Sequence, residues 1–417
     1  MNIVYATSKA VERFIPMRRY LPSVVFILVV CPDLAKTADL PWQVNTPIVA
    51  VQKSVYLHTS GGSTWVTMEY VGPNLQLLET NAVMPIGDVL SNVKQRLSTD
   101  NGKTWSAFQP LPGTLVDYNG VEARESPGMA RFYDDQAGVL VETWTQLLKS
   151  WHTCWRISKD YGTTWSSPQL LRYEAGAEFD PGNPLDRDYL LNNRGYGGNN
   201  IIKLSGGKLL TSVGYARGPD GYTGSLCFIG TWNPAAEDYQ WTPSNRVAVS
   251  PDQSRFLTES EVAQLKDGRV LVIWRGSNTE TTPGRKWYSV STDGGMNLST
   301  PAELKYDDGS SFYSPSSYHR MIRSSLTDKL YWIGNITATP PVGPSPRSPL
   351  VIAEVSETGP IPSLKKSTVS SIDGPPLGED GIFSNFSLSE DRQSHNLNLY
   401  MMLDDGKSYK YVVTFVH

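Results

Sequence analysis

A short polar and aromatic motif that occurs three times constrains this chain more than any other feature. The segment "STDNGKTW", residues 98–105, follows the pattern S-x-D-x-G-x-T-W, and "SKDYGTTW", residues 158–165, repeats every defined position. A third copy at residues 291–298, "STDGGMNL", keeps Ser, Asp and Gly but has Asn297 and Leu298 in place of Thr and Trp. The Asp can accept hydrogen bonds from its own turn, the Gly adopts a backbone conformation that other residues avoid, and the Trp packs back onto a sheet. We therefore interpret each copy as a turn-fixing element of a repeated fold, not as a catalytic site.

Paired apolar segments of a second kind indicate what is being repeated. Five segments share one layout, in which a polar lead-in precedes an apolar strand, a turn and a second apolar strand; they lie at residues 125–144, 197–216, 258–277, 314–336 and 383–403. A similar region, residues 48–95, precedes them. Spacings of roughly 55–75 residues leave room for four strands in each unit. The pattern predicts an all-β fold, a six-bladed β-propeller of four-stranded antiparallel blades over residues 41–417. A five- or seven-bladed propeller and a β-sandwich are the alternatives.

The N-terminal residues differ from this body. Arg18 and Arg19 precede an apolar run, Leu21–Cys31, which is shorter than a bilayer-spanning helix requires and suits the core of a signal peptide. We expect residues 1–40 to be a signal peptide or N-terminal extension, and the protein to be secreted without stable insertion into a membrane. The alternative is a buried strand at Val24–Val30. Three N-glycosylation tripeptides are compatible with secretion; they begin at Asn297, Asn335 and Asn385.

The composition narrows the classes of molecule that the protein is expected to bind. The net charge is −4 and no long basic run occurs, which gives no reason to expect nucleic-acid binding. The 12 Trp and 21 Tyr residues are typical of all-β proteins that handle sugars, so a glycan is the expected partner. The three cysteines, Cys31, Cys154 and Cys227, allow at most one disulfide and lack the spacing of a metal site. We therefore expect no metal and no cofactor.

The repeated motifs resemble the Asp boxes of the sialidase (neuraminidase) superfamily, whose members are propellers with BNR repeats. The likeness extends over most of the chain after about residue 80. It implies an exo-acting glycoside hydrolase that releases a terminal acidic sugar, sialic acid or a related one. Members of that family bind the sugar carboxylate with three arginines and use a Glu-activated Tyr as nucleophile and an Asp as acid/base. A guanidinium suits this task because it stays charged and matches a carboxylate bidentately.

Three residues carry the family pattern onto this chain. The segment "ESEVAQLKDGRVLVIWRGS" supplies Glu261 at the start of one strand and Arg275 at the end of the next, followed by the third Asp-box-like turn. The segment "SPRSPLVIAEV" supplies Arg347 before a strand, as the third family arginine would be placed. The resemblance assigns catalysis to Glu261 and carboxylate binding to Arg275 and Arg347.

Other family positions are matched less closely. Arg124 lies one residue before the expected place of the first arginine, which Glu125 occupies, and a second candidate, Arg13 in "RFIP", lies ahead of the apolar run. Asp88 is the candidate acid/base. The last-blade segment "SNFSLSED" at residues 384–391 contains no Tyr.

A modified site can be assembled from other polar residues. The segment "LNNRGYGGNN" places Arg194, Tyr196, Asn199 and Asn200 beside glycines that allow close approach of a ligand. Tyr196 is the candidate catalytic tyrosine, and Arg194 and Asn199 are candidate substrate-binding residues. His319 and His152 are candidate acid/base residues because imidazole titrates near neutrality. A His–Tyr pair would suit a lyase acting on acidic polysaccharides, so the alternatives are such a lyase, another glycosidase on this propeller, or a noncatalytic glycan-binding propeller.

Overall fold

A computed structural model describes the propeller part of the chain. The described residues are 46–58, 64–83, 90–111, 115–118, 120–174, 180, 182–183, 185–217, 223–374, 381–403 and 405–416. Residues 39–417 form one compact unit. The predicted signal segment, its alternative strand, Arg13 and Asp88 lie outside the described residues.

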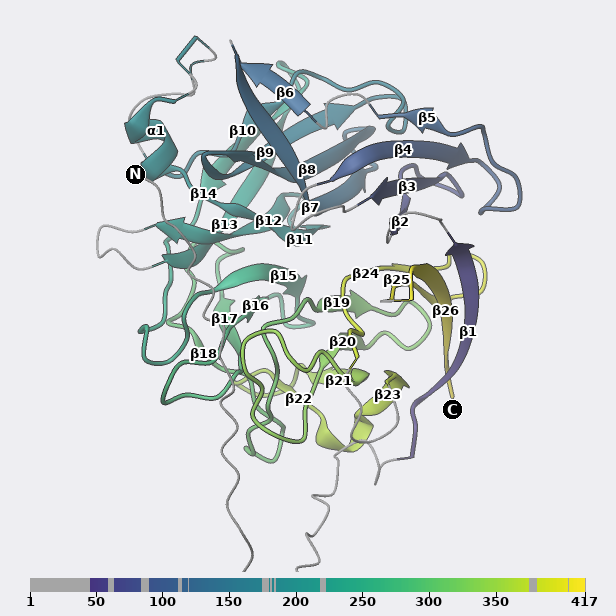
Figure 1. Ribbon diagram of the computed structural model, residues 1–417, viewed down its shortest axis with the longest axis vertical. Coiled ribbons are helices and arrows are strands. Elements are labelled where there is room, and N and C mark those ends of the chain that lie inside the picture. Colours follow the sequence, from purple (N-terminus) through teal and green to yellow (C-terminus); the bar gives the residue numbers. More distant parts are fainter. Residues whose placement is uncertain are drawn as a thin grey trace, which may run out of the picture. The chain divides into compact units, whose positions relative to one another are not determined.

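Six antiparallel sheets follow one another along the chain and form a six-bladed β-propeller, which confirms the predicted fold class (Figure 1). The first three blades are β2 (Thr64–Tyr70), β3 (Leu77–Val83), β4 (Ser91–Ser98) and β5 (Gln109–Pro110); β7 (Val121–Asp134), β8 (Val139–Leu148), β9 (Ser150–Ser158) and β10 (Gln169–Leu170), with β6 (Leu115–Tyr118) added beside β7; and β11 (Tyr196–Lys203), β12 (Leu209–Arg217), β13 (Thr223–Asn233) and β14 (Asp238–Pro243).

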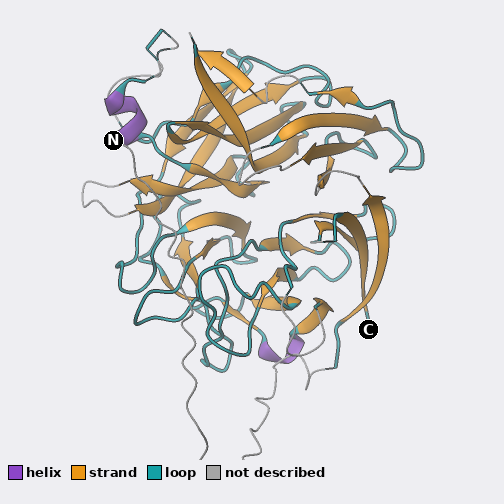
Figure 2. Ribbon diagram, viewed as in Figure 1, coloured by secondary structure: helices purple, strands orange, loops and turns teal. Residues whose placement is uncertain are grey.

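The second half of the propeller repeats this order. Its blades are β15 (Thr258–Gln264), β16 (Val270–Arg275), β17 (Lys286–Ser291) and β18 (Ala302–Glu303); β19 (Arg320–Arg323), β20 (Leu330–Asn335) and β21 (Leu350–Ser356), with β22 (Ser363–Leu364) and β23 (Ser370–Asp373) both on β21; and β24 (Phe386–Glu390), β25 (Leu397–Met402), β26 (Lys407–Phe415) and β1 (Val49–His58). Among the described residues, only α1 (Arg187–Asn192) and the 3-10 turn η1 (Lys366–Thr368) are helical (Figure 2).

The first strand of each blade lies toward the centre. Strand β11 contacts β7 and β15, β2 contacts β24, and β15 contacts β19, so neighbouring blades meet through these strands. The five predicted hairpins are the first two strands of blades 2 to 6. The region predicted as the opening blade, residues 48–95, is divided differently: β1 pairs with β26, from Val49 opposite Phe415 to His58 opposite Lys407, and completes the last blade. This pairing closes the ring and covers an edge of β26 that would otherwise be unpaired.

All three copies of the repeated motif fold as self-contained turns, between β4 and β5, β9 and β10, and β17 and β18. In the first copy the Ser98 hydroxyl donates to Asp100 at 2.8 Å, and Asp100 accepts the Thr104 N–H at 2.8 Å and its hydroxyl at 2.6 Å. The third copy keeps this geometry because the Asn297 side-chain amide donates to Asp293 at 2.6 Å in place of the Thr hydroxyl. The aspartates are used within their own turns, as the sequence predicts.

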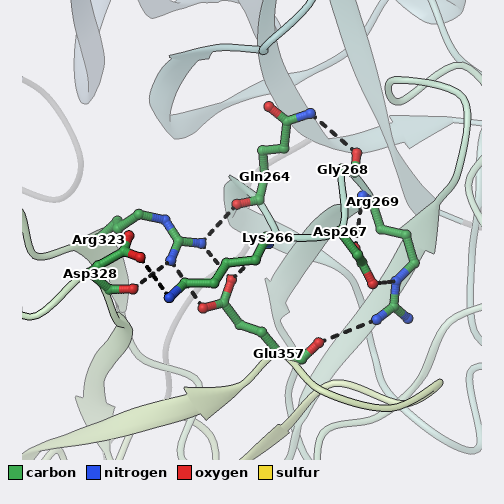
Figure 3. Close-up of polar contacts among 8 residues, drawn as sticks. All are labelled: Gln264, Lys266, Asp267, Gly268, Arg269, Arg323, Asp328 and Glu357. Carbon is green, nitrogen blue, oxygen red and sulfur yellow. Dashed lines mark hydrogen bonds and ion pairs between the residues drawn. The ribbon is translucent and has the colours of Figure 1, made fainter.

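Polar contacts join blades 4 and 5 at the end of β15 farthest from Thr258 (Figure 3). Arg323 of β19 pairs with Glu357 at 2.5 Å and donates to the Gln264 carbonyl at 3.0 Å. Arg269, in the turn after β15, donates to the Gly359 carbonyl at 2.8 Å. The two blades also share a buried apolar cluster that includes Ile273 and Trp332. These contacts fix β15 against β19, and the opposite ends of both strands reach the residues described next.

Candidate active site

An ion pair between Arg275 and Glu259 lies where β15 begins and β16 ends. Arg275 Nη1 is 2.5 Å from Glu259 Oε2, and each side chain is 18% exposed. The β15–β16 pairing shifts register between Thr258 and Glu261, so Glu259 lies in a bulge. Its φ of +39° is a left-handed conformation that a residue with a side chain adopts at a cost in free energy. The bulge turns the Glu259 side chain toward the end of β16.

Further residues hold this pair in place. Arg275 Nε donates to the Ser316 hydroxyl at 2.8 Å. The amide of Asn199 donates to the carbonyl oxygens of Glu259 at 3.1 Å and His319 at 3.3 Å, linking three blades. Tyr196, which packs edge-on against Trp151 with ring centroids 5.4 Å apart, interacts electrostatically with Arg275. The predicted residues Arg275, Tyr196, Asn199 and His319 are therefore brought together.

Arg347 lies at the same group of residues. Its charge acts on Lys286, which is also under the influence of Arg275 and Glu259. Arg347 Nη1 contacts Asn385 Oδ1 at 3.5 Å, and Asn385 has a φ of +61°. The left-handed conformation at Glu259 places strained backbone beside Arg275, as is common at ligand-binding sites. Arg275 and Arg347 both act on Lys286, so positive charge gathers here, and guanidinium groups favour an anionic ligand.

A second buried group lies next to this pair. Arg320 Nε is 2.7 Å from Glu261 Oε1, and Glu261 Oε2 accepts the Met321 N–H at 3.0 Å. Glu261 is fully buried, and burial raises its pKa to about 7 while Arg320 opposes the rise. Arg320 Nη1 also donates to the Tyr318 hydroxyl at 3.3 Å. The fold thus gives Glu261 an interior position between blades and leaves Glu259 as the partly exposed carboxylate.

Tyr318 was not predicted from the sequence and has features of a functional tyrosine. Its ring packs edge-on against Trp65 of blade 1 and Phe386 of blade 6, at centroid distances of 6.0 and 5.5 Å, which places it near the propeller axis. Burial raises its pKa to about 12, and Arg320 opposes that rise. Glu261 and Glu259 also act on it electrostatically. Tyr318 remains partly exposed.

The other predicted residues lie elsewhere or are enclosed. Arg124 pairs with Glu122 at 2.8 Å, and both side chains are more than half exposed. The Arg194 carbonyl accepts the Tyr173 hydroxyl at 2.6 Å, and the Arg194 charge acts on His152. His152 is buried, and burial lowers its pKa to about 4.

His319 is fully buried, with Nε2 at 3.2 Å from the Ile273 carbonyl. Its pKa lies well below the usual range because of burial and the neighbouring Lys286. Of the glycosylation tripeptides, Asn335 is also fully buried and donates to the carbonyls of Pro349 and Phe383.

A hollow in the described part of the chain lies away from these charged residues. This hollow of about 560 Å³ lies between the first two Asp boxes and is lined by Arg96, Arg156 and Trp165, not by the residues above. Among the described residues, no group of His, Cys, Asp and Glu could hold a metal ion.

No helix in the described part of the chain is long and apolar enough to cross a membrane. Cys154 and Cys227 are buried thiols that form no disulfide.

Comparisons with known proteins place the fold. No protein-family model matches the chain, and no curated protein sequence matches it. A sialidase, the Hadza microbial sialidase Hz136, superposes with a TM-score of 0.57 at 14% identity over 85% of this chain and 66% of its own. The intramolecular trans-sialidase of Ruminococcus gnavus gives 0.54 at 11% over 84% and 94%. The α-L-arabinanase of Penicillium chrysogenum, complexed with arabinobiose, gives 0.53 at 16% over 89% and 97%. The chain therefore has the propeller fold of sialidases and related glycoside hydrolases.

Proposed function

We propose that this protein is an exo-acting glycoside hydrolase that recognises a terminal sugar bearing a carboxylate, sialic acid or a related acidic sugar. The observation that carries the proposal is the Arg275–Glu259 pair, which joins the end of β16 to the start of β15, with Arg347 close by. Arg275 and Arg347 would bind the sugar carboxylate, and Glu259 would orient Arg275. The sialidases among the structural neighbours support this choice of substrate class.

We assign the nucleophile to Tyr318. The Tyr318 hydroxyl accepts a hydrogen bond from Arg320. The charge of Arg320 would stabilise the phenolate that forms as the proton leaves. Glu259 is the partly exposed carboxylate and would receive that proton. The Tyr318 oxygen would bond to the anomeric carbon as the glycosidic bond breaks, and the leaving oxygen would take its proton from solvent water. A second water would then hydrolyse the glycosyl–tyrosine bond, and its proton would return to the tyrosine oxygen. A neutral Tyr avoids the repulsion that a carboxylate nucleophile would meet from an acidic sugar.

A panel of fluorogenic glycosides tests the proposal. We expect release of fluorophore from α-sialosides or uronides by the wild-type protein, a loss of at least about 100-fold in Arg275→Ala, and no turnover by Tyr318→Phe with binding retained. Arg124→Ala is the matched control, because Arg124 pairs only with its strand neighbour Glu122 in the described contacts and should leave turnover unchanged. Absence of turnover on every acidic glycoside would reject the proposed substrate class.

A second candidate is a glycosidase for neutral sugars. The observation that favours it is the last blade, where Phe383, Asn385 and Phe386 stand in the segment expected to carry the family tyrosine. The arabinanase of P. chrysogenum shares the fold over nearly its whole length. Hydrolysis of arabinobiose with an unchanged rate in Arg275→Ala would favour this candidate. A lyase receives less support, since His319 and His152 are both buried.

A further inference from the structure

Lys286 is a fully buried lysine that the proposed chemistry does not use. It begins β17 and lies directly opposite Arg275 across the β16–β17 pair. Among the described residues, no carboxylate forms an ion pair with it. Like charges on directly opposed strand residues destabilise a sheet, and burial of an uncompensated ammonium costs more still. Burial, followed by the charge of Arg275, accordingly lowers the pKa of Lys286 well below its usual range.

The Lys286 ammonium group donates hydrogen bonds to a loop of the next blade. Its Nζ donates to the carbonyls of Ser317 at 2.6 Å and Pro315 at 3.3 Å. Residues 314–319 form no regular strand, and Ser314, Ser317 and His319 are fully buried. Buried carbonyls outside regular structure need donors. The Pro315 carbonyl also accepts the Ser317 N–H at 2.8 Å, and Lys286 makes its shorter bond to the Ser317 carbonyl.

The two carbonyls bracket Ser316, whose hydroxyl accepts the bond from Arg275 Nε at 2.8 Å. The same loop leads directly into Tyr318 and His319. We propose that Lys286 is a positioning residue that fixes the 315–317 loop, so that Ser316 holds the Arg275 guanidinium in the orientation that binds a carboxylate. This inference rests on the proposed function for its ligand class, but its structural step can be tested without a substrate.

The structural step is tested by NMR of the Arg275 Nε–H group, identified by its loss in Arg275→Lys. In Lys286→Met, which keeps the chain length but removes the donors, we expect this resonance to move in the same direction as in Ser316→Ala. Ser289→Ala is the matched control, because Ser289 also lies on β17 but donates to the Ser299 carbonyl at 2.6 Å. An Arg275 resonance that is unchanged in folded Lys286→Met overturns the inference whatever the substrate is.

The functional step is tested by titration with the α-methyl glycoside of N-acetylneuraminic acid and with its methyl ester. Lys286→Met and Ser316→Ala should each weaken binding of the acid about 10-fold and leave the ester unchanged, and the double variant should lose little more than either single one. A general structural defect would weaken the binding of both ligands alike. Additive losses in the double variant would show that Lys286 and Ser316 act independently. Either result overturns the proposal. If the wild-type protein binds neither ligand, the proposed substrate fails, and the NMR comparison alone decides the role of Lys286.

Discussion

Arg275 pairs with Glu259 across the bulged start of β15, at 2.5 Å, while Glu261 two residues later pairs with Arg320 at 2.7 Å inside the fold. In a regular strand, residues 259 and 261 would point the same way. The register shift between Thr258 and Glu261 separates them, so that one carboxylate is partly exposed and the other is fully enclosed. The two acids therefore have different expected roles, and parallel substitutions distinguish them.

Glu259→Gln should reduce function and should lower stability less than Glu261→Gln does. The amide keeps the shape of the side chain but removes the negative charge that faces Arg275 and would receive the nucleophile's proton. We expect turnover of an acidic glycoside to fall about 100-fold or more, and the free energy of unfolding to fall by less than in Glu261→Gln, because Glu259 is 18% exposed whereas Glu261 is fully buried. Initial rates and urea denaturation of the same preparations measure both effects. Full turnover in this variant would remove Glu259 from the chemistry.

Glu261→Gln should instead mainly lower the stability of the folded protein. At pH 8, above the Glu261 pKa of about 7, this change leaves the Arg320 guanidinium without its buried counter-charge. Removing one partner of a buried ion pair costs about 3 kcal/mol or more. Urea denaturation at pH 8, with Glu259→Gln as the comparison, measures the loss. A variant as stable as the wild-type protein would show that Arg320 finds another partner.

The sequence was sufficient for the architecture because the features that determine it are local. An Asp box forms from residues within one turn, and each predicted hairpin pairs adjacent segments, so both follow from short sequence patterns. The exchange of β1 into the last blade joins Val49 to Phe415 and has no local signal.

The site was less predictable for the same reason. Arg275 and Arg347 matched a family pattern, whereas Glu259 depends on a bulge, and Tyr318 depends on Trp65 and Phe386 from other blades. The only local signal for Tyr318 in the sequence is its position just before a short strand, in the segment "SSYHR".

The Asp boxes should stabilise the protein in a pH-dependent way. Hydrogen bonds, first from the Thr104 side chain, lower the pKa of Asp100 to about 2, and those from Ser291 and Asn297 lower the pKa of Asp293 to about 2. An unfolded Asp titrates near a pKa of about 3.9. Because the folded pKa values are depressed, this stabilisation is complete above about pH 4 and is lost as the pH falls toward 2.

Asp100→Asn should therefore lower the melting temperature at pH 6, and its melting temperature should depend less on pH between 4 and 2 than that of the wild-type protein. Scanning calorimetry across this range provides the measurement. Asp252→Asn, at an exposed position outside the boxes, is the control and should follow the wild-type curve. Parallel acid curves for wild type and Asp100→Asn would contradict the assignment.

The first two Asp boxes use their tryptophans differently, and this difference predicts a coupling between blades. In the first box, Trp105 Nε1 donates to the Gly102 carbonyl at 3.0 Å. In the second, the equivalent carbonyl, that of Gly162, accepts Gln95 Nε2 of blade 1 at 2.8 Å, and in the described structure Trp165 Nε1 has no hydrogen-bond partner. Gln95→Met should free that carbonyl for the Trp165 indole.

Gln95→Met should therefore cost little, whereas Trp165→Phe also loses part of the ring that lies 4.5 Å from the Arg156 guanidinium. Gln95→Met is expected to lose less than about 1 kcal/mol, since Trp165 can replace the missing donor, and Trp165→Phe should lose no hydrogen bond. The double variant leaves the Gly162 carbonyl without either donor and should lose about 1 kcal/mol more than the sum of the single losses. Urea denaturation of the four proteins in one double-mutant cycle measures the coupling. Additive losses would mean that the Trp165 indole cannot reach the carbonyl, and that the Gln95 contact alone joins the second box to blade 1.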